Sequence, residues 1–137
     1  MNSYVLDASV AAAWYLEESF SPAARAWQER MLEGRVRLVV PGLHFWEMGN
    51  IFRKLAMRRI LDETTARELF DLHMDASLER IDPDPRAVLR RAFEFGATMN
   101  DAVYIALALD HDLRLLTAER STTGWVARMA KRVELVR

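Results

Sequence analysis

Cysteine is absent from the sequence, and its absence excludes several kinds of chemistry. Without thiols the protein has no disulfide, no thiolate nucleophile and no zinc site built from cysteine. The composition agrees with a reducing compartment. We therefore expect a cytoplasmic protein.

Long apolar runs are also absent. The longest, residues 10–16 and 102–109, fall far below the roughly 20 residues that a membrane-spanning helix needs. The first residues show neither the basic region nor the long apolar region of a secretory signal. We therefore expect a soluble protein that makes no contact with a membrane.

An excess of charge of either sign is missing as well. Lysine and arginine number 19, aspartate and glutamate number 20, and the net charge is -1. No overall basic field indicates a nucleic-acid partner, so a contact with RNA would require a local patch. Hydrophobic residues make up 51% of the 137 residues, and no repeat or linker divides them. We expect a single domain over residues 1–137 with its own core.

Short apolar runs alternate with helical patterns along the chain. Strands are predicted over residues 4–6, 37–40, 78–81, 113–116 and 133–136. Helices are predicted over residues 8–16, 22–33, 45–56, 66–73, 85–95, 101–110 and 123–130. Ser21, Thr65 and Asp84 are the expected N-terminal caps of three of these helices. The alternation predicts parallel strands with right-handed crossovers, hence a three-layer helix-sheet-helix sandwich of the α/β class.

Four carboxylates fall just past a strand end or in the first turns of a helix that follows a break: Asp7, Glu47, Asp101 and Glu119. Because the carboxyl ends of parallel strands line one crevice, we expect all four to meet there. Crowded carboxylates repel one another unless protons or a cation neutralise them. Oxygen ligands favour Mg²⁺ or Mn²⁺, which can activate water and polarise a phosphodiester.

Less specific interpretations exist for each acid taken alone. Asp7 and Asp101 could be N-terminal caps, and Glu47 could be a solvated first-turn acid favoured by the helix dipole. The recurrence of all four at one edge favours the metal site. No side-chain nucleophile competes, because Ser9 lacks a nucleophile elbow and the three histidines lack triad or metal spacing.

Basic residues on the helix over 45–56 and just beyond it include Arg53, Lys54 and Arg58, which are candidates for RNA contacts. A run of this kind is more often a solvated helix face than a nucleic-acid track. The four tryptophans belong by the same reasoning to the core or to a protein interface, with base stacking as the less common role. We interpret His44, His73 and His111 as structural or surface residues.

The ordered motifs resemble the PIN domain family, and more narrowly the ribonuclease toxins of VapBC toxin-antitoxin pairs. The resemblance covers nearly the whole chain and rests on Val5-Leu6-Asp7-Ala8-Ser9, on Pro41 followed by Glu47, on residues 101–108 and on Leu115-Leu116-Thr117-Ala118-Glu119. It implies a parallel five-stranded sheet, an endoribonuclease dependent on Mg²⁺ or Mn²⁺, a homodimer, and inhibition by a cognate VapB-like antitoxin.

By position, the resemblance implies that Asp7, Glu47 and Asp101 hold the metal and that Ser9 and Thr117 support them by hydrogen bonds. Glu119 stands where the family usually has aspartate, and its extra methylene displaces the carboxylate. Three roles stay open for Glu119: direct ligation of the metal, action through a water, or no part in the site.

Two alternatives from other classes stay open. The first is a PIN-fold binding module for RNA or protein that has lost catalysis, motivated by Glu119. The second is a phosphatase or phospho-receiver, which is disfavoured because Ser9 stands where a phosphatase has its second aspartate.

Overall fold

The five strands form one sheet in which every neighbouring pair is parallel, in the order β3-β2-β1-β4-β5. The computed structural model describes all residues, 1–137. Its strands are β1 (Asn2–Leu6), β2 (Val36–Val40), β3 (Glu79–Arg80), β4 (Arg114–Thr117) and β5 (Val133–Leu135). The predicted parallel sheet between helices is confirmed, and β5 is an edge strand as expected.

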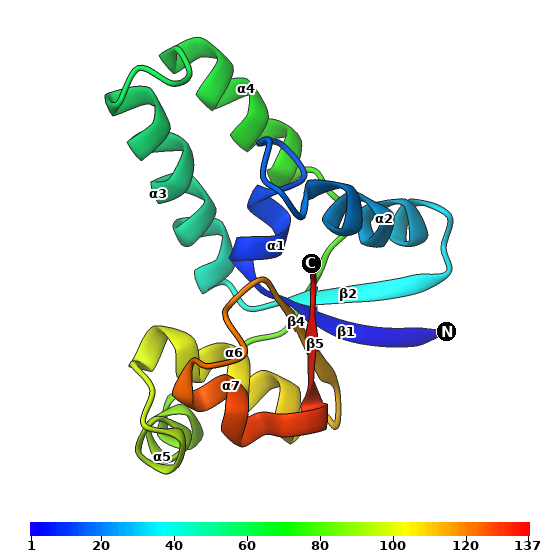
Figure 1. Cartoon of the computed structure of the whole chain (residues 1–137), viewed down its shortest axis with the longest axis vertical. Coiled ribbons are helices and arrows are strands. Elements are labelled where there is room, and N and C mark those ends of the chain that lie inside the picture. The colour runs from blue at the N-terminus through cyan, green and yellow to red at the C-terminus, as the bar shows by residue number, and fades with distance from the viewer.

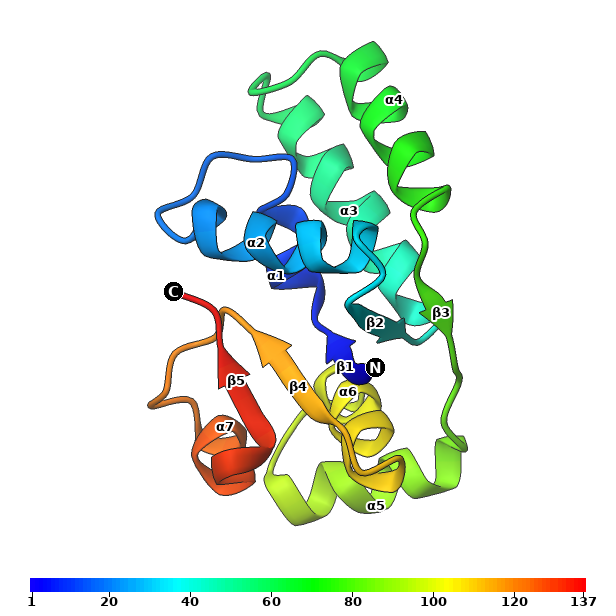
Figure 2. The same ribbon diagram turned by 90° about the vertical axis from the view of Figure 1, so that its right-hand side faces the viewer.

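Seven α-helices surround the sheet, and none is long and apolar enough to cross a membrane. They are α1 (Ala8–Ala12), α2 (Ser21–Leu32), α3 (Leu43–Met57), α4 (Glu63–Met74), α5 (Pro85–Phe95), α6 (Met99–Asp110) and α7 (Gly124–Met129). The helices α1 and α2 lie on one side of the sheet and α5, α6 and α7 on the other (Figures 1 and 2). The helices α3 and α4 pack side by side as an arm that extends beyond the sheet (Figure 1).

Side chains of the central strand β1 alternate between the two helical layers. Leu6 belongs to the larger core, with residues of α1, α2 and α3, whereas Val5 belongs to the core formed with α6 and α7. Both side chains are fully buried. Burial on both faces explains why the strands have continuous apolar sequences rather than alternating ones.

Two predicted helix boundaries were wrong at the N-terminal side of the fold. The helix α1 ends at Ala12 instead of Leu16, and a loop leads from it to α2. Ser21 does not cap α2: its hydroxyl accepts a hydrogen bond from the Glu18 backbone and donates one to the Leu16 carbonyl. The serine therefore stabilises the loop rather than the helix end.

Two other helix starts also differ from the prediction. Asp62, rather than Thr65, caps α4, because its carboxylate accepts the Thr65 backbone N–H. The helix α6 begins at Met99 and is capped by Thr98. The predicted cap and proline at Asp84 and Pro85 are confirmed, since the Asp84 carboxylate accepts the Arg86 N–H.

Candidate functional site

Asp7 lies where β1 ends, between the strand and α1. Its backbone N–H donates to the Leu116 carbonyl at 3.0 Å, so the residue still pairs with β4. It occupies the N-cap position of α1, but its side chain makes no capping hydrogen bond. Instead, its Oδ2 accepts hydrogen bonds from Ser9 Oγ at 3.0 Å and Thr117 Oγ1 at 2.7 Å. The carboxylate is thus held in place without serving the helix.

The two hydroxyls that hold Asp7 are themselves held by the backbone after β4. The Ala118 N–H donates to Ser9 Oγ at 3.1 Å, and the Glu119 N–H donates to Thr117 Oγ1 at 3.1 Å. Each hydroxyl accepts from the backbone and donates to Asp7, so its proton has a defined direction. Asp7 Oδ1 has no hydrogen-bond partner within the chain. One oxygen of this carboxylate is therefore left for a ligand.

Glu47 lies in the second turn of α3 and is partly buried. Its Oε1 accepts a 2.5 Å hydrogen bond from the hydroxyl of Tyr104, which stands on α6. This contact joins residues that are 57 positions apart in the sequence. Glu47 is therefore not the freely solvated first-turn acid of the less specific interpretation.

Asp101 does not act as a helix cap. That role belongs to Thr98, whose Oγ1 accepts the Asp101 backbone N–H at 3.2 Å. The Asp101 carboxylate takes part in no hydrogen bond or ion pair within the chain. Glu119 is exposed, and its side chain likewise has no partner. The charge of Asp101 still acts on both Asp7 and Glu47, and the charge of Glu119 acts on Asp7.

The electrostatics of the site penalise ionised carboxylates. Burial raises the pKa of Asp7, the hydrogen bonds from Thr117 and Ser9 lower it, and the charges of Glu119 and Asp101 raise it further. Burial likewise raises the pKa of Glu47, against the lowering effect of Tyr104, and Asp7 and Asp101 add to the increase. No basic side chain contributes to either shift. A proton or a cation would relieve the repulsion.

The donor set suits a hard divalent cation, because every candidate ligand atom is a carboxylate or hydroxyl oxygen. Asp7, Glu47 and Asp101 are close enough to interact through their charges, and Glu119 interacts in this way with Asp7. No three of the chain's acidic and histidine side chains stand near enough together to hold an ion as they are. The structure thus brings the predicted acids to one edge of the sheet without a finished ligand cluster.

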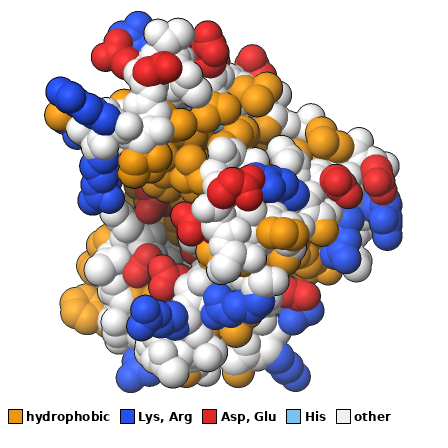
Figure 3. All heavy atoms as spheres, turned by 45° about the horizontal axis from the view of Figure 1, so that its top comes forward, with side chains coloured by type: hydrophobic (Ala, Val, Ile, Leu, Met, Phe, Trp, Pro, Cys, Tyr) orange, Lys and Arg blue, Asp and Glu red, His pale blue; other side chains and the backbone are white.

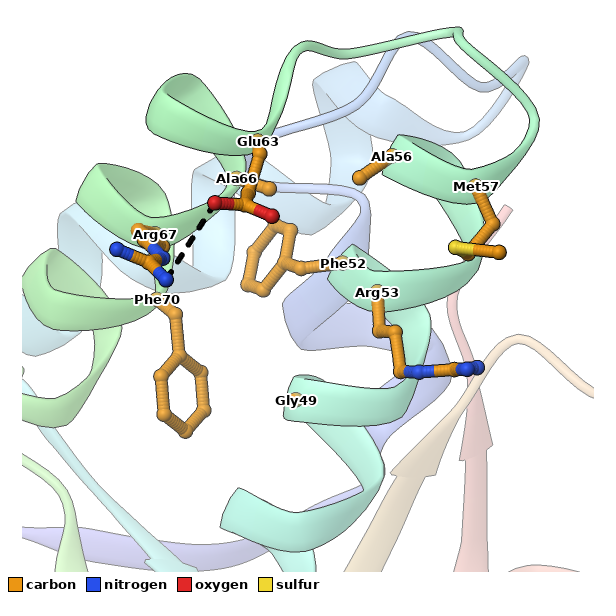
Figure 4. Close-up of a pocket in the computed structure, with 9 residues that line it drawn as sticks. All are labelled: Gly49, Phe52, Arg53, Ala56, Met57, Glu63, Ala66, Arg67 and Phe70. Atoms are coloured by element: carbon orange, nitrogen blue, oxygen red, sulfur yellow. Dashed lines mark ion pairs between the residues drawn. The ribbon is translucent and has the colours of Figure 1, made fainter.

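The three basic RNA-contact candidates lie on two different sides of α3. Lys54 and Arg58 line a groove of about 390 Å³ that also includes Ser9, the residue that donates to Asp7. Arg53 instead lies at the edge of a second pocket, between α3 and α4, and extends away from α4 (Figure 4). Only the first two residues therefore share a groove with the acidic edge of the sheet.

The second pocket has a volume of about 410 Å³ and is lined by Phe52, Ala56 and Met57 of α3 and by Ala66 and Phe70 of α4 (Figure 4). Hydrophobic side chains cover the surface around the arm, while acidic side chains gather in the hollow beneath it (Figure 3). The acidic edge and the apolar arm are therefore neighbouring but chemically distinct surfaces.

Sequence reasoning missed the role of Tyr104 at the site. It treated this residue as one of the apolar positions of a helix, although its hydroxyl contacts Glu47. A signal existed, because Tyr104 follows Asp101 by one helical turn and so shares its face. His44 and His73 are buried and His111 is exposed, as the structural or surface interpretation expects.

Comparison with protein families matches residues 4–122 to the model of the PIN domain. No curated protein matches the chain. Among solved structures, PAE2754 from Pyrobaculum aerophilum is 27% identical, with a TM-score of 0.72, and the alignment covers 98% of this chain and 89% of that one.

Two similar structures come from toxin-antitoxin systems. VapBC2 from Rickettsia felis, bound to a DNA fragment from its promoter, is 12% identical with a TM-score of 0.68, over 98% of this chain and 99% of that one. A toxin-antitoxin complex from Klebsiella pneumoniae is 14% identical with a TM-score of 0.60, over 98% of both chains. At these identities the likeness shows a shared fold.

Proposed function

The chain belongs to the PIN domain family, and from this premise we propose that it is a metal-dependent endoribonuclease, a hydrolase of phosphodiester bonds. The observation that carries the proposal is the state of Asp7. Two oriented hydroxyls hold its carboxylate, burial and then the charges of nearby acids raise its pKa, and no basic side chain neutralises it. Such an arrangement is unfavourable for folding alone and favourable for binding Mg²⁺ or Mn²⁺.

Asp7, Glu47 and Asp101 are the residues that would hold the cation, with Glu119 at the exposed margin of the site. A divalent cation, when bound, supplies positive charge to the phosphate and lowers the pKa of the attacking water. Ser9 and Thr117 orient Asp7, and Tyr104 donates a hydrogen bond to Glu47. The chain itself contributes orientation and negative charge, and it needs no side-chain nucleophile.

RNA is the proposed substrate, and the groove beside Ser9 is the proposed path of its backbone. Lys54 and Arg58 line this groove, are exposed, and take part in no ion pair within the chain. Free cations at the margin of an acidic site can bind phosphates on either side of the scissile bond. Arg53 faces elsewhere and is the weaker candidate of the three.

The proposed biological role is the toxin of a toxin-antitoxin pair, with a VapB-like antitoxin as its inhibitor. Support comes from the fold shared with toxin-antitoxin proteins. The arm offers a partner exposed apolar side chains, among them Met57, Ile60 and Leu72. Exposed Leu89 and Phe93 on α5 similarly offer a face for a second copy of the chain, in a homodimer. If the role is correct, the product of a small adjacent reading frame should bind the protein and suppress cleavage.

The decisive experiment is an RNA cleavage assay with the Asp7→Asn variant in Mn²⁺ or Mg²⁺. The substitution preserves size and removes the charge, so we expect the cleavage rate to fall by roughly 10²- to 10³-fold while the circular dichroism spectrum is unchanged. Asp75→Asn, which alters an exposed aspartate after α4, is the control and should cleave normally. Undiminished cleavage by Asp7→Asn would reject the assignment.

The same assay addresses the second candidate, a PIN-fold binding module without catalysis. Two observations favour it: Glu119 is exposed, and the acids do not form a finished ligand cluster. A wild-type protein that binds RNA but neither binds Mn²⁺ nor cleaves would establish the module in place of the nuclease.

A further inference from the structure

A buried network of side chains leads from Glu47 through the molecule to α4. Beyond Glu47, the Tyr104 hydroxyl lies 3.4 Å from His44 Nδ1, and His44 Nε2 lies 2.8 Å from His73 Nε2. His73 Nδ1 in turn lies 2.7 Å from the hydroxyl of Tyr15. The four residues beyond Glu47 come from the loop after α1 and from α3, α4 and α6. We call Tyr104, His44, His73 and Tyr15 the buried network.

Glu47 in its ionised form, the form in which a carboxylate binds a cation, sets the direction of every hydrogen bond in this network. Glu47 can only accept, so Tyr104 donates to it, and the Tyr104 oxygen must then accept from His44 Nδ1–H. A neutral His44 consequently has a lone pair on Nε2, which accepts from His73 Nε2–H. His73 Nδ1 is then the acceptor for the Tyr15 hydroxyl. All four donors therefore point toward Glu47.

Burial supports this assignment. Both histidine side chains are fully buried. Burial lowers the pKa of His44 to about 3, with His73 adding to the effect, and lowers the pKa of His73 to about 4. Each ring is thus neutral near pH 7 and carries a single proton. No buried polar side-chain atom of the protein lacks a hydrogen-bond partner, so the network is complete as it stands.

We propose that Tyr104 is a positioning residue, and that the buried network holds its hydroxyl in the orientation that presents Glu47 for metal binding. The proposal rests on the proposed function in one respect, the role of Glu47 as a ligand. Glu47 Oε1 is occupied by Tyr104, which leaves Oε2 without a partner in the chain. Groups of this kind, which orient a ligand without touching the metal, commonly contribute 10- to 100-fold to metal affinity.

A purely structural role is the competing explanation, because two buried histidines need hydrogen-bond partners in any case. The two explanations differ in the hydrogen-bond direction that they require within the buried network. A structural network could equally run the other way, with His44 Nε2–H donating to His73 and His44 Nδ1 accepting from Tyr104. In that state Tyr104 could not donate to Glu47.

The first experiment is calorimetric titration with Mn²⁺ of Tyr104→Phe, which removes the hydroxyl and keeps the ring. We expect the Kd for Mn²⁺ to rise about tenfold. In a Glu47→Gln background the same substitution should change the Kd no further, because Tyr104 acts through Glu47. Tyr4→Phe is the control, since Tyr4 packs on Trp27 and its hydroxyl makes no hydrogen bond within the chain. An unchanged Kd in Tyr104→Phe, or an equal effect in both backgrounds, would overturn the proposal.

The second experiment reads the histidine tautomers of the wild-type protein by long-range ¹H–¹⁵N NMR without metal. The proposal expects His44 protonated on Nδ1 and His73 protonated on Nε2. Protonation of His44 on Nε2 would reverse the network and overturn the proposal, even if Tyr104→Phe fails to fold. Because this spectrum needs neither metal nor RNA, it tests the positioning of Glu47 by Tyr104 separately from the proposed function. A wild-type protein that binds no Mn²⁺ but shows the expected tautomers contradicts the metal role and retains the positioning of Glu47 by Tyr104.

Discussion

The acidic edge of the sheet and the arm formed by α3 and α4 are unfavourable for the isolated chain in opposite ways. At the edge, partly buried carboxylates lie close together with raised pKa values and no basic partner. On the arm, Met57 is 69% exposed, Ile60 61% and Leu72 60%, so apolar surface faces water. Packing explains neither feature, since buried charge and exposed apolar patches both reduce the stability or solubility of a lone chain.

The difference teaches what each region requires. Carboxylates are relieved by a cation, and apolar side chains are relieved by a protein surface. The two regions are not independent, because His44 of α3 and His73 of α4 connect them through the buried network. A change that disturbs this connection should therefore affect both regions. A change in the groove lined by Lys54 and Arg58 should affect only the binding of RNA.

The largest expected effect is a loss of stability on acidification, which disturbs the connection through His44 and His73. Burial lowers the pKa of His44 to about 3 and of His73 to about 4 in the folded protein, whereas both have a pKa near 6.5 in the unfolded chain. At a pH between these values the unfolded chain therefore binds more protons than the folded protein. Stability from this source is complete above about pH 6.5 and is lost as the pH falls toward 4. By pH 5 the loss should reach about 2 kcal/mol for each histidine. Urea unfolding at pH 7, 6 and 5 measures it.

Asp7 and Glu47 act against this loss, since a carboxylate with a raised pKa takes up a proton more readily in the folded state. The loss should therefore be steeper in Asp7→Asn than in the wild type. His111→Gln is the control, because His111 is exposed, and it should leave the pH dependence unchanged. A stability of the Asp7→Asn/Glu47→Gln variant that does not decrease between pH 7 and pH 5 would show that the two buried rings do not remain neutral, because this variant lacks both opposing carboxylates.

Changes in the groove between the two regions should have a smaller effect, and this effect should be confined to RNA binding. Removing both cations in Lys54→Gln/Arg58→Gln should weaken RNA binding about tenfold, or about 1.4 kcal/mol, because both residues line the groove beside Ser9. The slope of log affinity against log salt should fall by about 1.4 for two lost phosphate contacts. Fluorescence anisotropy with a labelled RNA at several salt concentrations measures both quantities.

A charge-matched control is Arg30→Gln/Arg35→Gln, on α2 and the turn that follows it. This variant also loses two positive charges but leaves the groove intact, and the proposal expects RNA affinity close to that of the wild type. Equal weakening by the two double variants would mean that net charge, rather than the groove, determines binding.

The sequence predicted the elements that carry the acids but not the contacts that orient them. Asp7 was found because β1 is a short apolar run that stops at a charge, and a strand end is a local signal. Asp84 with Pro85 was likewise local, and its capping role is confirmed. By contrast, the bond from Tyr104 to Glu47 joins α6 to α3 and depends on tertiary packing, which periodicity does not encode.

The same limit explains the helix boundaries and the basic residues. Helical periodicity ran to Leu16, but the chain turns after Ala12, because the loop to α2 has its own hydrogen bonds through Ser21. Arg53 and Lys54 are neighbours in the sequence, yet successive residues of a helix point about 100° apart. They therefore line different pockets.

Glu119 should show the smallest effect and test how far the acidic edge extends. Its side chain is exposed and unpartnered, but its charge contributes to the raised pKa of Asp7. Glu119→Gln should weaken Mn²⁺ binding by about threefold, the scale expected of an exposed charge interaction. Glu119→Asp keeps the charge and should change the Kd by less. Calorimetric titration of the two variants compares charge with length directly, and a larger loss in Glu119→Asp would show that the glutamate's reach places it among the ligands.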